Sequence, residues 1–150
     1  MSDIEWHCLA FDKLTTVQLY DVLGLRSEVF VIEQACIFQD MDGADAQAVH
    51  VLGYQNGLLT AYARCFEADI KFNEASIGRV ATRHSSRGGG VGHAVMKRAI
   101  ACVFHQWGRQ PIRIGAQAHL EAFYGQHGFV RAGPIYCEDG ISHVEMLRNV

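Results

Sequence analysis

Arg87-Gly88-Gly89-Gly90-Val91-Gly92 is the stretch that says most about the fold of this chain. It separates a predicted strand, residues 75–82, from a predicted helix that runs to Trp107. Consecutive glycines cost conformational entropy, and they usually serve to let backbone amides approach another group closely. At a helix start, free amides and the helix dipole favour an anion, and Arg87 can add a charge-assisted hydrogen bond. The stretch therefore predicts a diphosphate-binding turn between a strand and a helix.

Two well-known phosphate motifs do not fit this stretch. A P-loop would need Gly-Lys-Ser or Gly-Lys-Thr, and neither follows the glycines. A dinucleotide fingerprint would need the spacing G-x-G-x-x-G and an acidic residue at the end of a second strand about 20 residues later, and both are absent. A flexible connector without chemical function remains the alternative at this point.

Outward from the glycines, the apolar periodicity predicts a mixed α/β order. Thr15 and Gln18 form a capping-box pattern at a helix start, and Asn56-Gly57 is typical of a tight hairpin. The predicted strands are 4–11, 49–54, 58–66, 75–82, 112–116, 129–136 and 141–148, and the predicted helices are 16–32, the segment from the glycines to Trp107, and 118–127. Residues 35–48 are expected to form an acidic loop. The order β-α-β-β-β-α-β-α-β-β argues against a doubly wound fold of repeated βαβ units.

Composition excludes several classes of protein. The 150 residues, 49% apolar and 19% charged, suit one folded domain over 1–150. A net charge of −3 gives no general attraction for nucleic acid or an anionic membrane. No apolar run reaches the roughly 18 residues of a membrane-spanning helix, and residues 1–13 lack the pattern of a secretory signal. We therefore expect a cytoplasmic protein.

The cysteines and histidines indicate neither a disulfide framework nor a metal site. The five cysteines are odd in number, widely spaced and without a CxxC pair, so we expect reduced thiols: Cys8, Cys36, Cys65, Cys102 and Cys137. The eight histidines contain no HxxxH or HExxH spacing. A bound metal has no support in the sequence.

Several stretches together resemble the GNAT superfamily of N-acetyltransferases. Arg87, Gly90 and Gly92 match its motif R/Q-x-x-G-x-G/A, and Phe123-Tyr124 to Gly128-Phe129 resembles its second signature, F-Y-x-x-x-G-F. Segments 26–34, 77–80, 116–118 and 136–143 are similar to the ElaA-like branch of that superfamily. The resemblance implies one α+β domain with a twisted, mostly antiparallel sheet of six to seven strands flanked by helices.

The resemblance also implies a site for acetyl-CoA. The resemblance implies that the strand before the glycines splays from its neighbour. Ile77 and Val80 break strict alternation, which fits either the bulge of that family or a plain strand with one irregular position. The Val80 amide would stabilise negative charge on the thioester oxygen. The implied cofactor-binding residues are Val80, Ala81 and Thr82 for pantetheine, Arg87, Gly88, Gly89, Gly90, Val91, Gly92 and His93 for the diphosphate, and Gln117 and Phe123.

Tyr124 matches the tyrosine that many relatives use to protonate the departing thiolate. A phenol with an ordinary pKa of about 10 can give a proton to a thiolate and regain it. From its position alone, Tyr124 could equally be an aromatic core residue.

The base and the acceptor site stay open at this point. The candidate bases are Glu33, His50, Glu138, Asp139 and His143, and the candidate substrate-binding residues are Arg26, Glu33, Glu138, Asp139 and His143. Arg26 and Glu33, seven residues apart on one helical face, either line the pocket or form a structural ion pair. His50 is either a base or a satisfied core histidine. The acidic loop with Asp40, Asp42 and Asp45 forms either an anionic mouth for a cationic amine or a solvated surface.

The resemblance implies transfer of an acetyl group from acetyl-CoA to a primary amine by direct attack in a ternary complex. The acceptor remains open among a polyamine-like amine, an amino sugar, a peptide N-terminus and a lysine side chain. The alternatives are a non-catalytic acyl-CoA-binding or sensor module and a nucleotide-phosphate binder. Exposed strand edges also allow a homodimer.

Overall fold

An eight-stranded sheet forms the centre of the computed structural model, which describes residues 3–150. The strands are β1 (Glu5–Ala10), β2 (Val49–Gln55), β3 (Leu58–Phe66), β4 (Ala75–Thr82), β5 (Ile112–Gln117), β6 (Val130–Arg131), β7 (Tyr136–Glu138) and β8 (Ile141–Arg148). Their order is β1-β2-β3-β4-β5-β8-β6, and β7 also pairs with β8. Only the β4–β5 pair is parallel among these strands, so the sheet is mostly antiparallel, as predicted.

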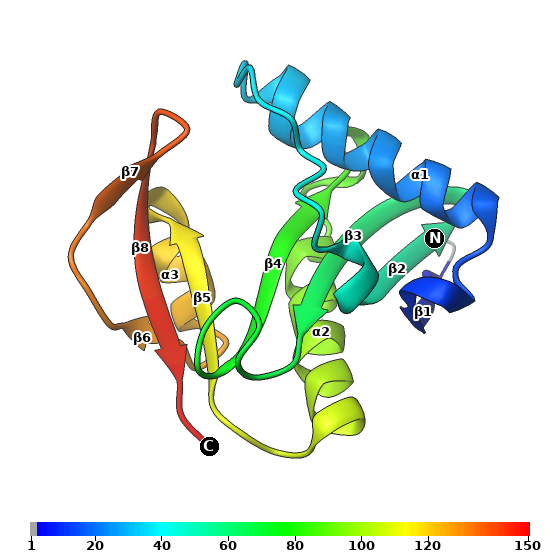
Figure 1. The fold of residues 1–150 in the computed structure, drawn as a ribbon. Helices are drawn as coiled ribbons and strands as arrows, with labels where there is room; N and C mark the ends of the chain where they lie inside the picture. The colour runs from blue at the N-terminus through cyan, green and yellow to red at the C-terminus, as the bar shows by residue number, and fades with distance from the viewer. Residues whose placement is uncertain (1–2) are drawn as a thin grey trace.

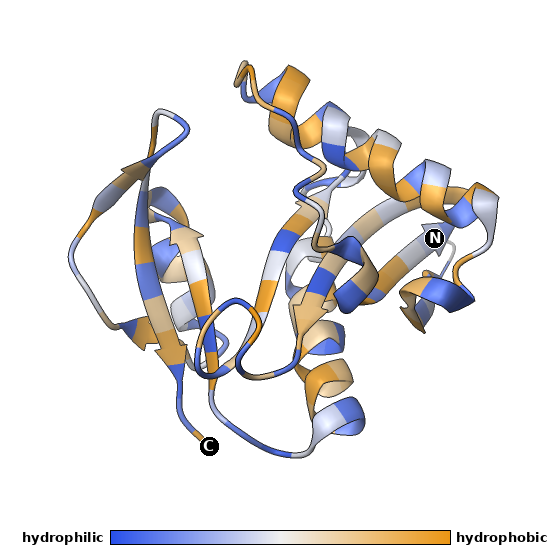
Figure 2. Cartoon of the chain, in the orientation of Figure 1, coloured by the Kyte–Doolittle hydropathy of each residue, from blue (hydrophilic) through white to orange (hydrophobic). Residues whose placement is uncertain are grey.

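Helices cover both faces of the sheet. They are α1 (Thr16–Arg26), which continues as a π-helical segment (Ser27–Glu33), α2 (Val91–Trp107) and α3 (Glu121–Gly125). One core lies between the sheet and the helices α2 and α3, and a second lies under α1, around Leu52, Tyr62 and Ala81. In Figure 2, hydrophobic and polar bands alternate along β4, β5 and β8, as expected for strands whose two faces meet different surroundings. Within residues 3–150, no helix combines the length and the apolar character needed to cross a membrane.

The local signals of the sequence were reliable. The Thr15 hydroxyl accepts from the Gln18 amide, and the Gln18 side chain accepts from the Thr15 amide, which confirms the capping box. Asn56 and Gly57 both have positive φ, 52° and 78°, between β2 and β3, which confirms the tight hairpin. The predicted helix 16–32 is helical to Glu33, although its last two turns are π-helical.

The prediction of one continuous strand over residues 129–136 is wrong. The segment is split into β6 and β7, both of which pair with β8, so the sheet has eight strands rather than six or seven. Gly133 and Pro134 lie in the interruption. Because proline has no backbone N–H to donate to a ladder, the edge strand breaks there.

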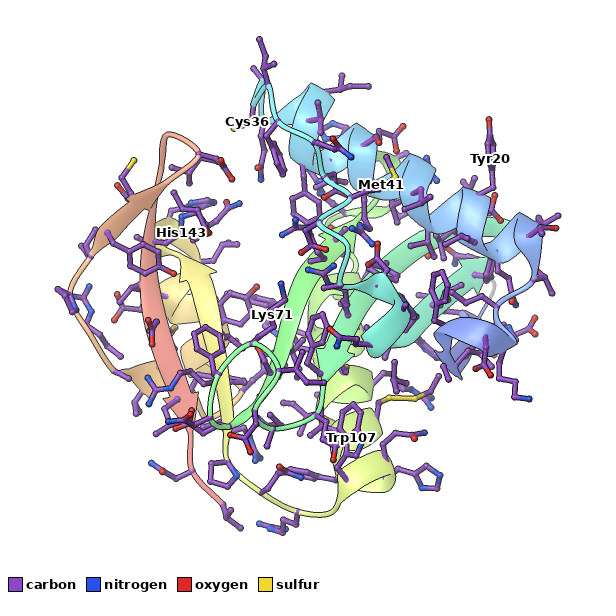
Figure 3. The ribbon with its side chains drawn as sticks, in the orientation of Figure 1. Tyr20, Cys36, Met41, Lys71, Trp107 and His143 are labelled. Carbon is purple, nitrogen blue, oxygen red and sulfur yellow. A yellow bond between two sulfur atoms is a disulfide. The ribbon has the colours of Figure 1, made fainter. Side chains whose placement is uncertain are left out.

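The expectation of five reduced thiols is also wrong. Cys8 of β1 and Cys102 of α2 form a disulfide, with their Cα atoms 6.5 Å apart and a sequence separation of 94 (Figure 3). The spacing rules for cysteines could not reveal this pair, since the two residues meet only once the helix packs on the sheet. Cys36, Cys65 and Cys137 are free thiols, and Cys65 is buried.

The two halves of the sheet separate at β4 and β5 (Figure 1). These strands pair only at Ala75–Ile112 and Ser76–Arg113, near their first residues, and then diverge. In β4, Arg79 and Val80 together face Ala63 of β3, since Tyr62 pairs with Ala81 and Arg64 with Gly78. This two-against-one pairing is a β-bulge, and Arg79 adopts a φ of +49° within it. The predicted bulge and splay are thus confirmed.

Candidate active site

A cleft of about 790 Å³ occupies the divergence of β4 and β5. It is lined from the π-helical segment, the loop after it, β4, the start of α2, β5, α3 and the β7–β8 hairpin. The predicted site residues that line it are Glu33, Val80, Thr82, Arg87, Gly92, Gln117, Phe123, Tyr124, Glu138, Asp139 and His143. Those that do not are Arg26, His50, Ala81, Gly88, Gly89, Gly90, Val91 and His93. Its volume is in the range of sites for small molecules and cofactors.

The glycine stretch leaves a set of free amides at the start of α2. Gly88 and Gly90 adopt φ values of +94° and +81°, which only glycine tolerates readily, and Gly90 is the N-cap of α2. The first helical hydrogen bond runs from the Ala94 amide to the Gly90 carbonyl. The amides of residues 88–93 donate to no group in residues 3–150, so they and the helix dipole are available to an anion.

Arg87 already has an anionic partner beside these amides. Its Nη1 and Nη2 donate to Glu33 Oε2 and Oε1 at 2.6 and 3.0 Å, and its Nε donates to the Thr82 hydroxyl at 3.1 Å. The hydrogen bond from Arg87 lowers the pKa of Glu33. A carboxylate held in this way is a weaker base, which argues against Glu33 as the proton acceptor.

At the end of β4, after the bulge, residues alternate between the cleft and the core. Val80 and Thr82 line the cleft, whereas the side chain of Ala81 is buried in the core under α1. Only the backbone of Ala81 can therefore contribute to the cleft.

Tyr124 is buried on α3 with its side chain against the cleft. Its ring meets Phe123 and Phe129 edge-on, at 5.1 and 6.2 Å between ring centres. Burial raises the pKa of Tyr124 to about 12, and its hydroxyl has no hydrogen-bond partner within residues 3–150. The hydroxyl thus stays protonated at neutral pH and is free to donate.

Phe123 connects α3 to the start of α2. Its ring lies 4.7 Å from the His93 ring, and a Cβ added at Gly92 would come within 3.4 Å of it. A Cβ at position 92 would thus only touch the Phe123 ring, whereas Gly88 and Gly90 are needed for their backbone conformation.

His143 lies on β8, where it pairs with Gln117 of β5. Its Nδ1 is 2.8 Å from the Ile141 carbonyl, which can only accept, so Nδ1 carries the proton of the neutral ring. The other nitrogen, Nε2, is then an acceptor, and it lies 3.8 Å from Glu138 Oε2. Tyr136 stacks on the imidazole at 5.7 Å and fixes its plane. This histidine is buried but lines the cleft, which suits a proton acceptor.

The assignment of His50 as a base is wrong. His50 is fully buried under α1 and does not line the cleft. Its Nδ1 is 2.6 Å from the Tyr62 hydroxyl and its Nε2 is 2.9 Å from the Asp45 carbonyl, so both ring nitrogens are satisfied. Burial lowers its pKa. His50 is therefore a core histidine with both ring nitrogens hydrogen-bonded, which was the second interpretation that the sequence allowed.

Arg26 is likewise a structural residue rather than a substrate-binding one. It is fully buried, and it donates to Asp40 Oδ2 and Asp45 Oδ1, both at 2.7 Å. Its partners come from the acidic loop and not from Glu33, which pairs with Arg87. Arg26 and Glu33 therefore neither pair with each other nor line the cleft together, although their spacing places them on one predicted helical face.

The acidic loop does not contribute free carboxylates to an anionic mouth, which was one of its two interpretations. Each carboxylate of the acidic loop is bonded to cations, because the loop folds back over β3 and β4. Asp40 binds Arg26 and Arg79; Asp42 binds Arg64 and Lys71; and Asp45 binds Arg26 and Arg64.

The cations at the end of the cleft next to the acidic loop were not predicted from the sequence. Arg64, Lys71 and Arg79 line it together with Phe38, Phe66 and Phe72. One signal was present, since Arg64 interrupts the apolar run of β3. A charge in a buried strand needs a partner, and that partner had to come from the acidic loop.

Comparisons with known proteins agree with this architecture. The model of the acetyltransferase (GNAT) domain matches residues 17–149. Protein ElaA of Escherichia coli K12 is 42% identical over 149 residues, which cover 98% of this chain and 97% of that one. The crystal structure of Escherichia coli ElaA superposes with a TM-score of 0.91 at 41% identity, over 97% and 99% of the two chains. An acyl-CoA N-acyltransferase from Pseudomonas aeruginosa superposes with a TM-score of 0.92 at 39% identity, with the same coverage.

Proposed function

The chain belongs to the GNAT acetyltransferase family, and on that premise we propose that it transfers an acetyl group from acetyl-CoA to a primary amine. The GNAT fold in general supports acyl transfer from acyl-CoA. The observation that carries the proposal is the divergence of β4 and β5, with free amides at one end and the buried Tyr124 hydroxyl on its wall. We propose that residues 1–150 act as one catalytic unit and that both substrates are bound before transfer.

The chain's own groups fit coenzyme A. The amides of residues 88–93 and the positive end of α2 would hold the diphosphate, because no protein group competes for them. Arg87 would exchange Glu33 for a phosphate oxygen. The unpaired edge of β4 from Thr82 to Val80 would hold the pantetheine amides. When bound, acetyl-CoA supplies an activated acyl group for an amine.

Tyr124 would supply the proton that the departing sulfur needs. Its buried hydroxyl keeps its proton at neutral pH and donates to no protein group in residues 3–150, so the proton is in place. The bulge at Arg79 and Val80 sets the direction of the Val80 amide, which would face the oxygen that gains negative charge.

His143 would accept the proton of the amine. Among the five candidate bases, His50 is in the core and Glu33 is paired with Arg87, whereas His143 lines the cleft and uses only Nδ1 for the Ile141 carbonyl. Glu138, 3.8 Å from Nε2 of His143, would stabilise the imidazolium that forms. With Asp139, it would also attract a cationic amine to the entrance.

The test measures product and binding separately. The protein is incubated with acetyl-CoA and a panel of amines, and mass spectrometry looks for acetylated products. Tyr124→Phe should lower kcat about 100-fold or more, while calorimetry shows unchanged coenzyme A affinity. Binding of coenzyme A without any acetylated product would refute catalysis and leave a binding module. No binding at millimolar coenzyme A would refute the proposal as a whole.

A further inference from the structure

Seven charged side chains form one linked network at the end of the cleft away from the glycine stretch. Hydrogen bonds of 2.7–3.2 Å join its members, which are Arg26, Arg64, Lys71, Arg79, Asp40, Asp42 and Asp45. Four of them are cations and three are carboxylates, so the network has one positive charge in excess. An anion is the partner that would complete it.

The excess charge faces the cleft. Arg26 and Arg64 are buried, whereas the side chains of Lys71 and Arg79 are 37% and 26% exposed and both line the cleft. Lys71 has one anionic partner, Asp42, at 3.2 Å. The Nη1 of Arg79 has no partner in residues 3–150, since Asp40 engages only Nε and Nη2. Both cations therefore retain donors for a ligand.

Arg64 carries a further unsatisfied donor of the same network. Its Nε is buried and has no hydrogen-bond partner, and it is the one such side-chain atom among the residues that the structure describes. Arg64 also lines the cleft. A buried N–H without an acceptor is costly, and a bound ligand or water that accepts from it would remove that cost.

Aromatic rings hold the cations in place and keep their surroundings apolar. The Lys71 ammonium lies 5.4 Å from the Phe66 ring, and the Arg79 guanidinium lies 6.0 and 5.9 Å from the rings of Phe30 and Phe38. Cation–π contacts of this kind position a charge without neutralising it.

The β7–β8 hairpin provides the opposite charge. It carries Glu138 and Asp139, next to His143, the proposed base. Figure 3 shows His143 on β8 and Lys71 on the loop before β4, well separated along the cleft. The acceptor region thus has an acidic end beside the base and a basic end at Lys71 and Arg79.

We propose that the acceptor is a small amine that also carries a carboxylate, with a chain between the two groups that is long enough to reach from Lys71 and Arg79 to His143. Its carboxylate would bind Lys71 and Arg79, and its amine would lie beside His143. The single excess charge of the network matches the single charge of a carboxylate, whereas a polyamine would meet an uncompensated cationic wall. This inference rests on the proposed acetyl transfer, which it makes more specific.

The test compares binding and transfer for matched ligands. Calorimetry in the presence of coenzyme A measures the affinities of linear amino acids of increasing chain length, with the amine at the end opposite the carboxylate, and of their amides, which keep the amine but lose the negative charge. The best amino acid should bind at least about tenfold more tightly than its amide. Lys71→Gln should reduce this ratio to below about threefold, and the control Lys13→Gln, an exposed lysine outside the cleft, should leave it unchanged.

The outcomes separate the two proposals. Equal affinity for the acid and its amide in the unmodified protein would overturn the carboxylate site, even if other amines are acetylated. The absence of amino-acid binding at ligand concentrations on the order of 10 mM would overturn it as well. A charge-dependent preference that disappears in Lys71→Gln supports the site. If that preference is present but no product forms with acetyl-CoA, then the carboxylate site stands and the transfer reaction fails.

Discussion

Asp40→Asn is the substitution that tests most directly how the bulge of β4 is held. Asp40 is buried, and its two carboxylate oxygens accept from Arg26 Nε at 2.7 Å and from Arg79 Nε at 2.9 Å. Asparagine keeps one acceptor oxygen but turns an NH₂ group toward a guanidinium. The change therefore removes at least one charge-assisted bond and leaves a buried cation partly unpaired.

The magnitude follows from these contacts. Breaking a buried ion pair by removing one partner costs about 3–5 kcal/mol. Arg26 keeps Asp45, and the Asp40 carbonyl still accepts from Arg79 Nη2, so the lower end, about 3 kcal/mol, is expected. For a domain of 150 residues, this corresponds to a fall in Tm of roughly 6–12 °C.

The effect on catalysis should exceed the effect on stability alone. Arg79 has a φ of +49°, a conformation that costs about 1–3 kcal/mol and persists only where surrounding contacts enforce it. Asp40 makes those contacts. Its loss should let the bulge relax and misdirect the Val80 amide, so kcat should fall more than coenzyme A affinity.

The assay is urea unfolding followed by circular dichroism, combined with steady-state kinetics at a temperature where the variant is folded. The control is Asp12→Asn, an exposed carboxylate outside the network, which should stay within about 0.5 kcal/mol of the unmodified protein. A destabilisation below about 1 kcal/mol by Asp40→Asn would show that the network does not hold the bulge, and the reasoning would then be refuted.

Three further predictions follow from single contacts. Glu33→Gln should tighten coenzyme A binding about two- to fivefold in calorimetry, because it frees Arg87 from an exposed ion pair worth at most about 1 kcal/mol; weaker binding would contradict this. Burial lowers the pKa of His50, so the unfolded chain takes up this proton at a higher pH than the folded chain does. As the pH is lowered from about 6.5, the free energy of unfolding should therefore decrease by up to about 1.4 kcal/mol per pH unit. His50→Gln should flatten that slope in urea unfolding. Reduction of Cys8–Cys102, which closes a 94-residue separation, should cost about 2–5 kcal/mol, and an unchanged Tm would refute it.

Local signals predicted the fold well because they depend on neighbouring residues. The capping box at Thr15, the Asn56-Gly57 turn and the apolar periods all act within a few residues, so their outcome can be read from the sequence. The bulge at Arg79 was also visible, as a break in alternation between Ile77 and Val80. The glycine stretch, where we propose that the cofactor binds, is contiguous in sequence and could be recognised for the same reason.

The charged network around Arg64 and Arg79 could not be predicted because its parts come from distant segments. Asp42 and Arg64 are 22 residues apart, and Arg79 is 39 residues from Asp40, so no spacing rule joins them. The sequence showed three carboxylates in a loop and suggested an anionic mouth. The fold instead places four cations against them, which reverses the sign of the net charge at this end of the cleft.

This reversal also explains how one network can serve both stability and specificity. A network with equal charges would be complete without a ligand, whereas this one keeps a cation in excess and exposes its two least constrained members, Lys71 and Arg79. The same Arg79 sits in the bulge that directs the Val80 amide. Binding of an anion there would therefore reinforce the backbone geometry on which the proposed transfer depends, and recognition of the acceptor would be coupled to the arrangement of the catalytic strand.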